Sequence, residues 1–118
     1  METIATAAVG VIALQHFLFM TLEMFLWDKP AGMRIFGLKP EFARATKALA
    51  ANQGLYNGFL AAGLLWSLVP GPGSFPVKMF FLGCVIIAGV FGGFTANRAI
   101  FFVQALPAAV AMALVIAS

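Results

Sequence analysis

Four long apolar stretches occupy almost the whole chain, at about 3–27, 46–69, 76–95 and 98–117. A helix needs about 20 apolar residues to cross the roughly 30 Å hydrocarbon core of a bilayer, and each stretch reaches that length. The chain is 63% hydrophobic and only 9% charged, which lies far outside the range of soluble domains. The sequence therefore predicts an all-α integral membrane four-helix bundle with short connections, forming a single four-span transmembrane domain over residues 1–118.

Basic residues are concentrated in the connections between the apolar stretches. Six of the seven Lys and Arg lie in the first and third connections: Lys29, Arg34, Lys39, Arg44, Lys47 and Arg98. The second connection holds only Lys78. Because cytoplasmic connections carry an excess of Lys and Arg, this bias predicts that these two connections face the cytoplasm and that both termini face outside. The positive charge thus indicates a topology in a lipid bilayer, and not a nucleic-acid partner.

The second apolar stretch carries most of the polar side chains. At about 100° per residue, a helix there places five residues within an arc of roughly 140°: Asn52, Gln53, Tyr56, Asn57 and Leu60. Small residues line the other side: Ala50, Gly54, Gly58 and Ala62. Amide groups without partners are costly in hydrocarbon, so we expect the polar arc to face protein or a wet cavity. The small residues let a neighbouring helix come close.

Two further polar residues lie on one face of the first apolar stretch. The seven-residue spacing of His16 and Glu23 puts them within about 20° of each other and about 10 Å apart along the axis. If each stretch is centred in the bilayer, six polar residues fall between its middle and about two turns toward the cytoplasm: His16, Glu23, Asn52, Gln53, Asn57 and Gln104. A bundle that turns these side chains inward would form one site for a ligand or a proton.

Glu23 is the residue best suited to proton chemistry. A carboxyl group removed from water favours its neutral form, so it can hold and exchange a proton near neutral pH. The structural alternative is that Glu23 pairs with Lys47 or Arg98. His16 could carry a proton, orient a ligand or serve as a hydrogen-bond partner of Asn57. Amide side chains more often link helices than bind ligands.

The sequence predicts no metal site and no cofactor. One His is too few for paired-histidine haem ligation, and Cys84 is the single cysteine. His16 and Glu23 are too far apart along the helix to share a metal ion directly.

Prolines, glycines and capping residues mark the connections. The sequence 70–73 (PGPG) predicts a turn, after which Ser74 is expected to cap the third helix. Pro40 suits the first position of the second helix, Asn97 can cap the fourth, and Pro107, which lacks an amide hydrogen, is expected to kink it. We expect a second ladder of small residues on the third helix to complement the one on the second: Cys84, Ala88, Gly92 and Ala96.

Three segments carry a family resemblance. They read LQHFLFMTLEMFLW, FGLKPEFARATKALAANQGLYNGFLAAGLLW and FVQALPA. They resemble the small bacterial four-span membrane proteins of the family named domain of unknown function 1304. The resemblance covers nearly the whole chain and implies a four-helix protein of the bacterial cytoplasmic (inner) membrane. It implies no activity, but the family's characteristic polar positions match His16, Glu23, Asn52, Gln53, Asn57 and Gln104.

Three classes of function fit these features. The preferred one is binding of a small hydrophobic or amphipathic molecule, or its proton-linked transport, with Glu23 as the proton-exchanging acid; small multidrug transporters also place a glutamate in the first of four spans. The second is a membrane-embedded enzyme on a lipid-like substrate, in which Glu23 and His16 move a proton. The third is a non-catalytic scaffold or subunit whose polar residues fix helix register. The sequence leaves a homo-oligomer open.

Overall fold

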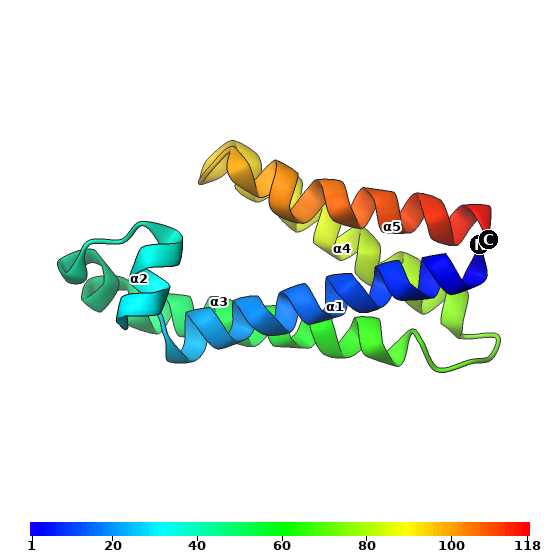
Figure 1. The fold of residues 1–118 in the computed structure, drawn as a ribbon, viewed down its shortest axis with the longest axis horizontal. Helices are drawn as coiled ribbons and strands as arrows, with labels where there is room; N and C mark the ends of the chain where they lie inside the picture. The colour runs from blue at the N-terminus through cyan, green and yellow to red at the C-terminus, as the bar shows by residue number, and fades with distance from the viewer. The chain divides into compact units, whose positions relative to one another are not determined.

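The protein is described here by a computed structural model that covers residues 1–118, and its regular structure is entirely helical (Figure 1). In chain order the elements are α1 (Glu2–Phe25), α2 (Pro30–Phe36), α3 (Pro40–Trp66), α4 (Ser74–Thr95), the π-helix η1 (Phe101–Ala105) and α5 (Leu106–Ala117). The predicted all-α fold is confirmed. Each apolar stretch corresponds to a long helical segment, the fourth being η1 followed by α5.

Two of these helices, α1 and α4, are long and apolar enough to cross a membrane. α3 is longer, but basic side chains in its first turns and the amides of Asn52 and Gln53 lower its hydropathy. The apolar helical segment Phe101–Ala117 falls below the length of the other two. Length and composition thus support spanning for two helices, and the four-span bundle stays a prediction.

The chain forms two compact units. The terminal unit contains Met1–Ala13 and Ala62–Ser118, and the central unit contains Leu14–Ala61. The helices α1 and α3 each contribute residues to both units. The organisation of residues 1–118 as one transmembrane domain stays a prediction.

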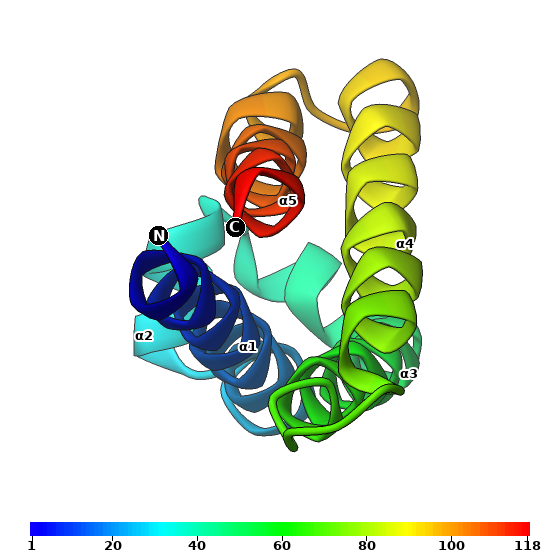
Figure 2. The ribbon, with the colours of Figure 1, turned by 90° about the vertical axis from the view of Figure 1, so that its right-hand side faces the viewer.

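In the terminal unit, α4 lies side by side with η1 and α5 (Figure 2). The two backbones approach most closely at Gly89, where an added Cβ would lie 2.5 Å from the backbone nitrogen of Ala105. One turn later, an added Cβ at Gly93 would lie 2.4 Å from Cδ2 and 2.5 Å from Cγ of the Phe101 ring. Gly89 therefore requires glycine, because a side chain would collide with backbone, whereas a side chain at Gly93 would have to displace the Phe101 ring.

The ladder of small residues predicted on the third helix is wrong at Ala88 and Ala96, although Gly92 does meet a neighbour, since an added Cβ there would lie 3.1 Å from Cγ2 of Ile100. Ala88 and Ala96 are exposed, whereas Gly89 is buried together with Leu82 and Val85. The rotation of α4 about its axis is set by these larger apolar side chains, which recur at helical spacing and must be buried first. The small residue that falls on their face is Gly89, one position after the predicted one.

The connection between α3 and α4 is tied by two serine hydroxyls. Ser67 is fully buried and donates a hydrogen bond to the carbonyl oxygen of Leu64. The Ser74 hydroxyl donates to the carbonyl oxygen of Ser67 at 2.6 Å. Ser74 is therefore not the cap that was predicted; Gly73 precedes α4 and no side chain caps it. The turn itself is confirmed, and Gly71 has a φ of 136°, which favours glycine.

Asn97 caps the C-terminal helical segment, as predicted, and a π-helix lies just before Pro107. The Asn97 side-chain oxygen accepts a hydrogen bond from the backbone N–H of Ala99 at 2.9 Å, as an N-cap residue does. The π-helix η1 precedes Pro107, and in it the N–H of Leu106 bonds to the carbonyl of Phe101, whereas the kink predicted at Pro107 stays a prediction. Since Pro107 has no N–H, one wider turn accommodates the missing α-helical bond.

Replacement of Gly89 by alanine should destabilise the protein by about 1–3 kcal/mol, because the new methyl group collides with the backbone of Ala105. Gly83→Ala is the matched control on the same helix, since an added Cβ there meets nothing within 4 Å. It should leave stability unchanged or raise it by up to about 1 kcal/mol through helix propensity. Thermal unfolding in detergent measures both, and equal unfolding midpoints would contradict the close approach.

Candidate functional site

The central unit joins Glu23 to Asn57. Glu23 lies in the sixth turn of α1 and Asn57 in the middle of α3. The Asn57 side-chain amide donates a hydrogen bond to Oε1 of Glu23 at 2.5 Å. Asn57 is buried and Glu23 is partly buried. An acid and an amide from two of the four predicted spans are thus in direct contact.

This contact depends on a close approach of α3 to α1. An added Cβ at Gly54 would lie 2.7 Å from Cγ of Met24 and 3.0 Å from Cβ of Glu23. One turn later, an added Cβ at Gly58 would lie 2.8 Å from the sulfur of Met20. Glycine at both positions lets the helices come close enough for short side chains to bond. The predicted close-approach face of α3 is confirmed at these two positions, and its neighbour is α1.

The polar residues of the arc predicted on α3 are not all buried, so the expectation that the whole arc faces protein is wrong. Asn57 is buried, but Asn52, Gln53 and Tyr56 are exposed. Asn57 lies at the edge of the arc, about 60° around the helix from Gly54, so it turns inward with the glycines. Asn52 and Tyr56 lie nearly opposite Gly54 on the same helical wheel. Because Gly54 and Gly58 pack against α1, Asn57 is the only amide of the arc that is buried.

His16 is fully buried in the central unit. Its ring packs edge-on against Phe19, with 5.3 Å between ring centroids. It lies two turns before Glu23 on the same helix, as the spacing predicts. Burial in an aromatic contact suits a structural imidazole as well as one that handles a proton.

Gln104 belongs to the terminal unit, where it is half-buried within η1. The structure thus brings Glu23 and Asn57 together and buries His16 in the same unit. The convergence of all six predicted residues on one site stays a prediction.

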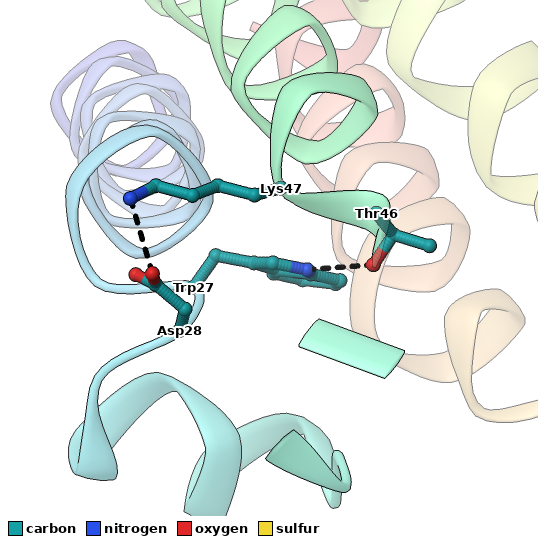
Figure 3. A network of polar contacts seen from close by, with 4 residues as sticks. All are labelled: Trp27, Asp28, Thr46 and Lys47. Atoms are coloured by element: carbon teal, nitrogen blue, oxygen red, sulfur yellow. Dashed lines mark hydrogen bonds and ion pairs between the residues drawn. The ribbon is translucent and has the colours of Figure 1, made fainter. Parts of the chain in front are cut away.

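The proposed pairing of Glu23 with Lys47 is not observed, because Lys47 has another partner. Its ammonium forms an ion pair with the Asp28 carboxylate at 3.0 Å (Figure 3). Beside it, the indole N–H of Trp27 donates to the hydroxyl oxygen of Thr46 at 3.0 Å. The Thr46 hydroxyl donates in turn to the carbonyl oxygen of Phe42. These contacts join the end of α1 to the start of α3.

Sequence reasoning missed this network because its partners are 19 positions apart. Trp27 and Asp28 stand out only as residues that flank an apolar stretch, and Thr46 and Lys47 only as part of a polar entry to the next one. No local pattern pairs them. The one signal that could have suggested such contacts is a short helix, α2, in the connection, because it returns the chain from the end of α1 to the start of α3.

The residues of the whole chain bring together no group of three or more His, Cys, Asp or Glu side chains that could hold a metal ion. Cys84 is half-buried in α4. The Glu23–Asn57 pair offers one carboxylate and one amide, which suits hydrogen bonding and proton exchange better than metal coordination.

Comparison with known proteins places the chain in a family. A family model described as "Protein of unknown function (DUF1304)" matches residues 10–116. The chain belongs to the DUF1304 family. The matched range includes Glu23, Asn57 and Gln104, so the predicted site lies within the part that the family shares. The resemblance seen in the sequence is thereby confirmed.

A relative within the curated proteins is "Uncharacterized protein YpaA" of Lactococcus lactis subsp. lactis (strain IL1403). It is 29% identical over 96 residues, which cover 80% of this chain and 81% of the relative. No solved structure is similar to this chain. These comparisons establish the DUF1304 membership and leave activity to be argued from the residues.

The Asp28–Lys47 pair predicts a pH dependence of stability. The hydrogen bond from Lys47 holds the pKa of the Asp28 carboxyl below its ordinary value. Because the pKa is lower in the folded state, the pair contributes stability above the ordinary pKa and loses it as the pH falls through the folded-state value. Asp28→Asn should therefore show a smaller fall in thermal stability than the wild type between pH 5 and pH 2.5, roughly the range of aspartate titration.

Glu41→Gln is the matched control for this titration, since Glu41 is an exposed acid in the first turn of α3. It should keep the wild-type fall. The unfolding midpoint is measured in a non-ionic detergent across the pH range. Identical curves for Asp28→Asn and the wild type would show that the ion pair does not contribute.

Proposed function

We propose that this chain is a four-span protein of the bacterial cytoplasmic membrane, with both termini outside. Two helices have the length and apolar composition of membrane spans. Large apolar side chains are exposed along them, as a lipid-facing surface requires: Val11, Leu14, Leu18, Ile87, Phe91 and Phe94. The six-to-one distribution of Lys and Arg supports the orientation. Asn57 and Glu23 on spans are tolerated because they bond to each other.

The orientation predicts the labelling of two engineered cysteines. In a Cys84→Ser background, Ser118→Cys should react with a membrane-impermeant maleimide added to intact cells. Ala31→Cys, at an exposed position of α2, should react only after the cells are opened. Neither substitution removes a basic residue, so the charge bias is kept. Protection of Ser118→Cys in intact cells, with labelling of Ala31→Cys, would reverse the proposed topology.

Within this framework, we propose that the Glu23–Asn57 pair forms a proton-linked binding site for a small amphipathic molecule. The observation that carries this proposal is the hydrogen bond between a partly buried carboxyl group and a buried amide inside long helices. Oε1 of Glu23 can accept this bond in either charge state, so Asn57 holds the carboxyl in place while its proton is gained or lost.

The carboxyl group suggests the chemistry of the ligand. When Glu23 releases its proton, a carboxylate remains in a region of low polarity, and a cationic group relieves that cost. Apolar parts of the ligand would be accommodated by flexible methionine side chains such as Met20 and Met24, which lie beside the pair. One proton leaves as one cation binds, so binding should weaken as the pH falls.

A structural role is the competing interpretation, because the same hydrogen bond links α1 to α3. Glu23→Gln separates the two. Glutamine keeps the shape and an oxygen that can accept from Asn57, but it has no exchangeable acid proton. The structural interpretation predicts that Glu23→Gln is silent, whereas a proton-linked site loses its function.

Binding of tetraphenylphosphonium, a lipophilic cation, measures this difference. We expect the wild type to bind it more tightly at pH 8 than at pH 6, with release of up to one proton per cation in paired calorimetric buffers. Glu23→Gln should bind at least about tenfold more weakly, a change of about 1.4 kcal/mol, and release no proton. Glu41→Gln, an exposed acid outside the pair, is the control and should behave as the wild type.

Two results would contradict the proposal. One is equal binding by the wild type and Glu23→Gln, with equal stability, which would leave the pair as a link between helices. The other is no binding of the cation by the wild type at either pH.

A further inference from the structure

The segment from Asp28 to Lys47, here called the basic hairpin, joins α1 to α3 in the central unit. It contains α2, the turn after it and the first turns of α3. Its five basic residues are Lys29, Arg34, Lys39, Arg44 and Lys47, and its two acids are Asp28 and Glu41, so its net charge is +3. All five basic residues are exposed. Asp28 is occupied by Lys47, which leaves four exposed cations against the single acid Glu41.

The basic hairpin has a defined shape. α2 lies against the end of α1, because an added Cβ at Gly32 would lie in the carbonyl group of Leu26. The Trp27 ring packs on Phe36 at the other end of α2, with 5.0 Å between ring centroids. Gly37 then reverses the chain with a φ of 65°. These contacts hold α2 against the residues that follow α1, and the network of Figure 3 joins Trp27 and Asp28 to α3.

The exposed surface of α2 and of the first turn of α3 combines charge with apolar side chains. Gly32 is buried, whereas Arg34 and Ile35 are exposed, the latter with 61% of its surface accessible. Phe42, in the first turn of α3, is 54% exposed. Basic and large apolar side chains that share a short amphipathic helix are typical of segments that lie at a membrane surface.

We propose that the basic hairpin binds anionic phospholipid headgroups, with Arg34 and Lys39 at the phosphates and Ile35 inserted at the acyl boundary. This inference rests on the membrane placement proposed above and goes beyond it, because it assigns a lipid preference. The basic hairpin follows α1, a helix of 24 residues that is apolar enough to span a membrane. If α1 spans, the basic hairpin begins at the membrane surface, at the level of the headgroups. Its net positive charge is complementary to anionic lipid and not to zwitterionic lipid.

An exposed basic surface could also meet nucleic acid or an acidic protein. The exposed Ile35 and Phe42 favour lipid, since nucleic-acid surfaces offer phosphates without an apolar phase beside them. A basic residue at an anionic membrane surface strengthens binding by roughly fivefold. Removal of two such charges should therefore weaken binding of anionic lipid by roughly 25-fold if the two act independently.

The test uses the full chain in detergent, titrated separately with phosphatidylglycerol and phosphatidylcholine, with bound lipid counted by native mass spectrometry. We expect the wild type to prefer phosphatidylglycerol. The preference should shrink in roughly 0.5 M salt, because salt screens the attraction between the basic side chains and the anionic headgroups. The double variant Arg34→Gln/Lys39→Gln should lose the preference. The charge-conserving double variant Arg34→Lys/Lys39→Arg should keep it, which separates loss of charge from loss of fold.

Lys78→Gln is the control for net charge, because Lys78 lies in the terminal unit at the start of α4. It should retain the wild-type preference. Equal affinity of the wild type for the two lipids would overturn the inference, as would an unchanged preference in Arg34→Gln/Lys39→Gln.

Carbonate extraction of the same chain from cell membranes distinguishes failure of this inference from failure of the proposed membrane placement. A chain that resists extraction but does not discriminate between the lipids overturns only the lipid preference. A chain that is extracted overturns the membrane placement and the lipid preference together.

Discussion

The close approach of α3 to α1 at Gly54 and Gly58 is the constraint on which the central unit depends. Without side chains at these positions, the methionines of α1 fill the space above the α3 backbone, and the short Asn57 amide reaches the Glu23 carboxyl. A larger residue at Gly54 would press on Cβ of Glu23 and the carbonyl oxygen of Met20, which would push the two helices apart. The hydrogen bond between Asn57 and Glu23 then offsets the free-energy cost of removing these two polar groups from water.

The same physical rule acts in the terminal unit with a different outcome. Gly89 brings α4 onto the backbone of Ala105, where an added Cβ would lie 2.5 Å from the backbone nitrogen. The contact there is one of dispersion and fit, and the adjacent π-helix absorbs the missing N–H of Pro107. Glycine thus supports a hydrogen-bonded polar pair in the central unit and a close backbone contact in the terminal unit. Membership of the DUF1304 family covers both regions, since the family match runs over residues 10–116.

Trp27 separates the Glu23–Asn57 pair from the basic hairpin, which begins at the next residue. On one side of this residue the helix carries an acid that contacts an amide; on the other, the chain becomes basic and folds back through α2. Trp27 itself donates a hydrogen bond to Thr46 while its ring covers Phe36, as expected of a side chain with an apolar body and a polar edge. In the proposed membrane placement, Trp27 would lie at the boundary between hydrocarbon and water.

The sequence by itself determined the helical class, the turn at 70–73, the start of α3 at Pro40 and the Asn97 cap, because each follows from local chemistry or from hydrophobic length. It also identified Glu23 and Asn57 as candidates, since polar residues in apolar stretches are conspicuous. Only the tertiary structure decided that Asn57 bonds to Glu23 while Asn52 and Gln53 stay exposed, that Gly89 and not Ala88 marks the seam of α4, and that Lys47 belongs to Asp28. The reason is physical: the rotation of a helix about its axis is set by which neighbour it packs against, and that neighbour is distant in sequence.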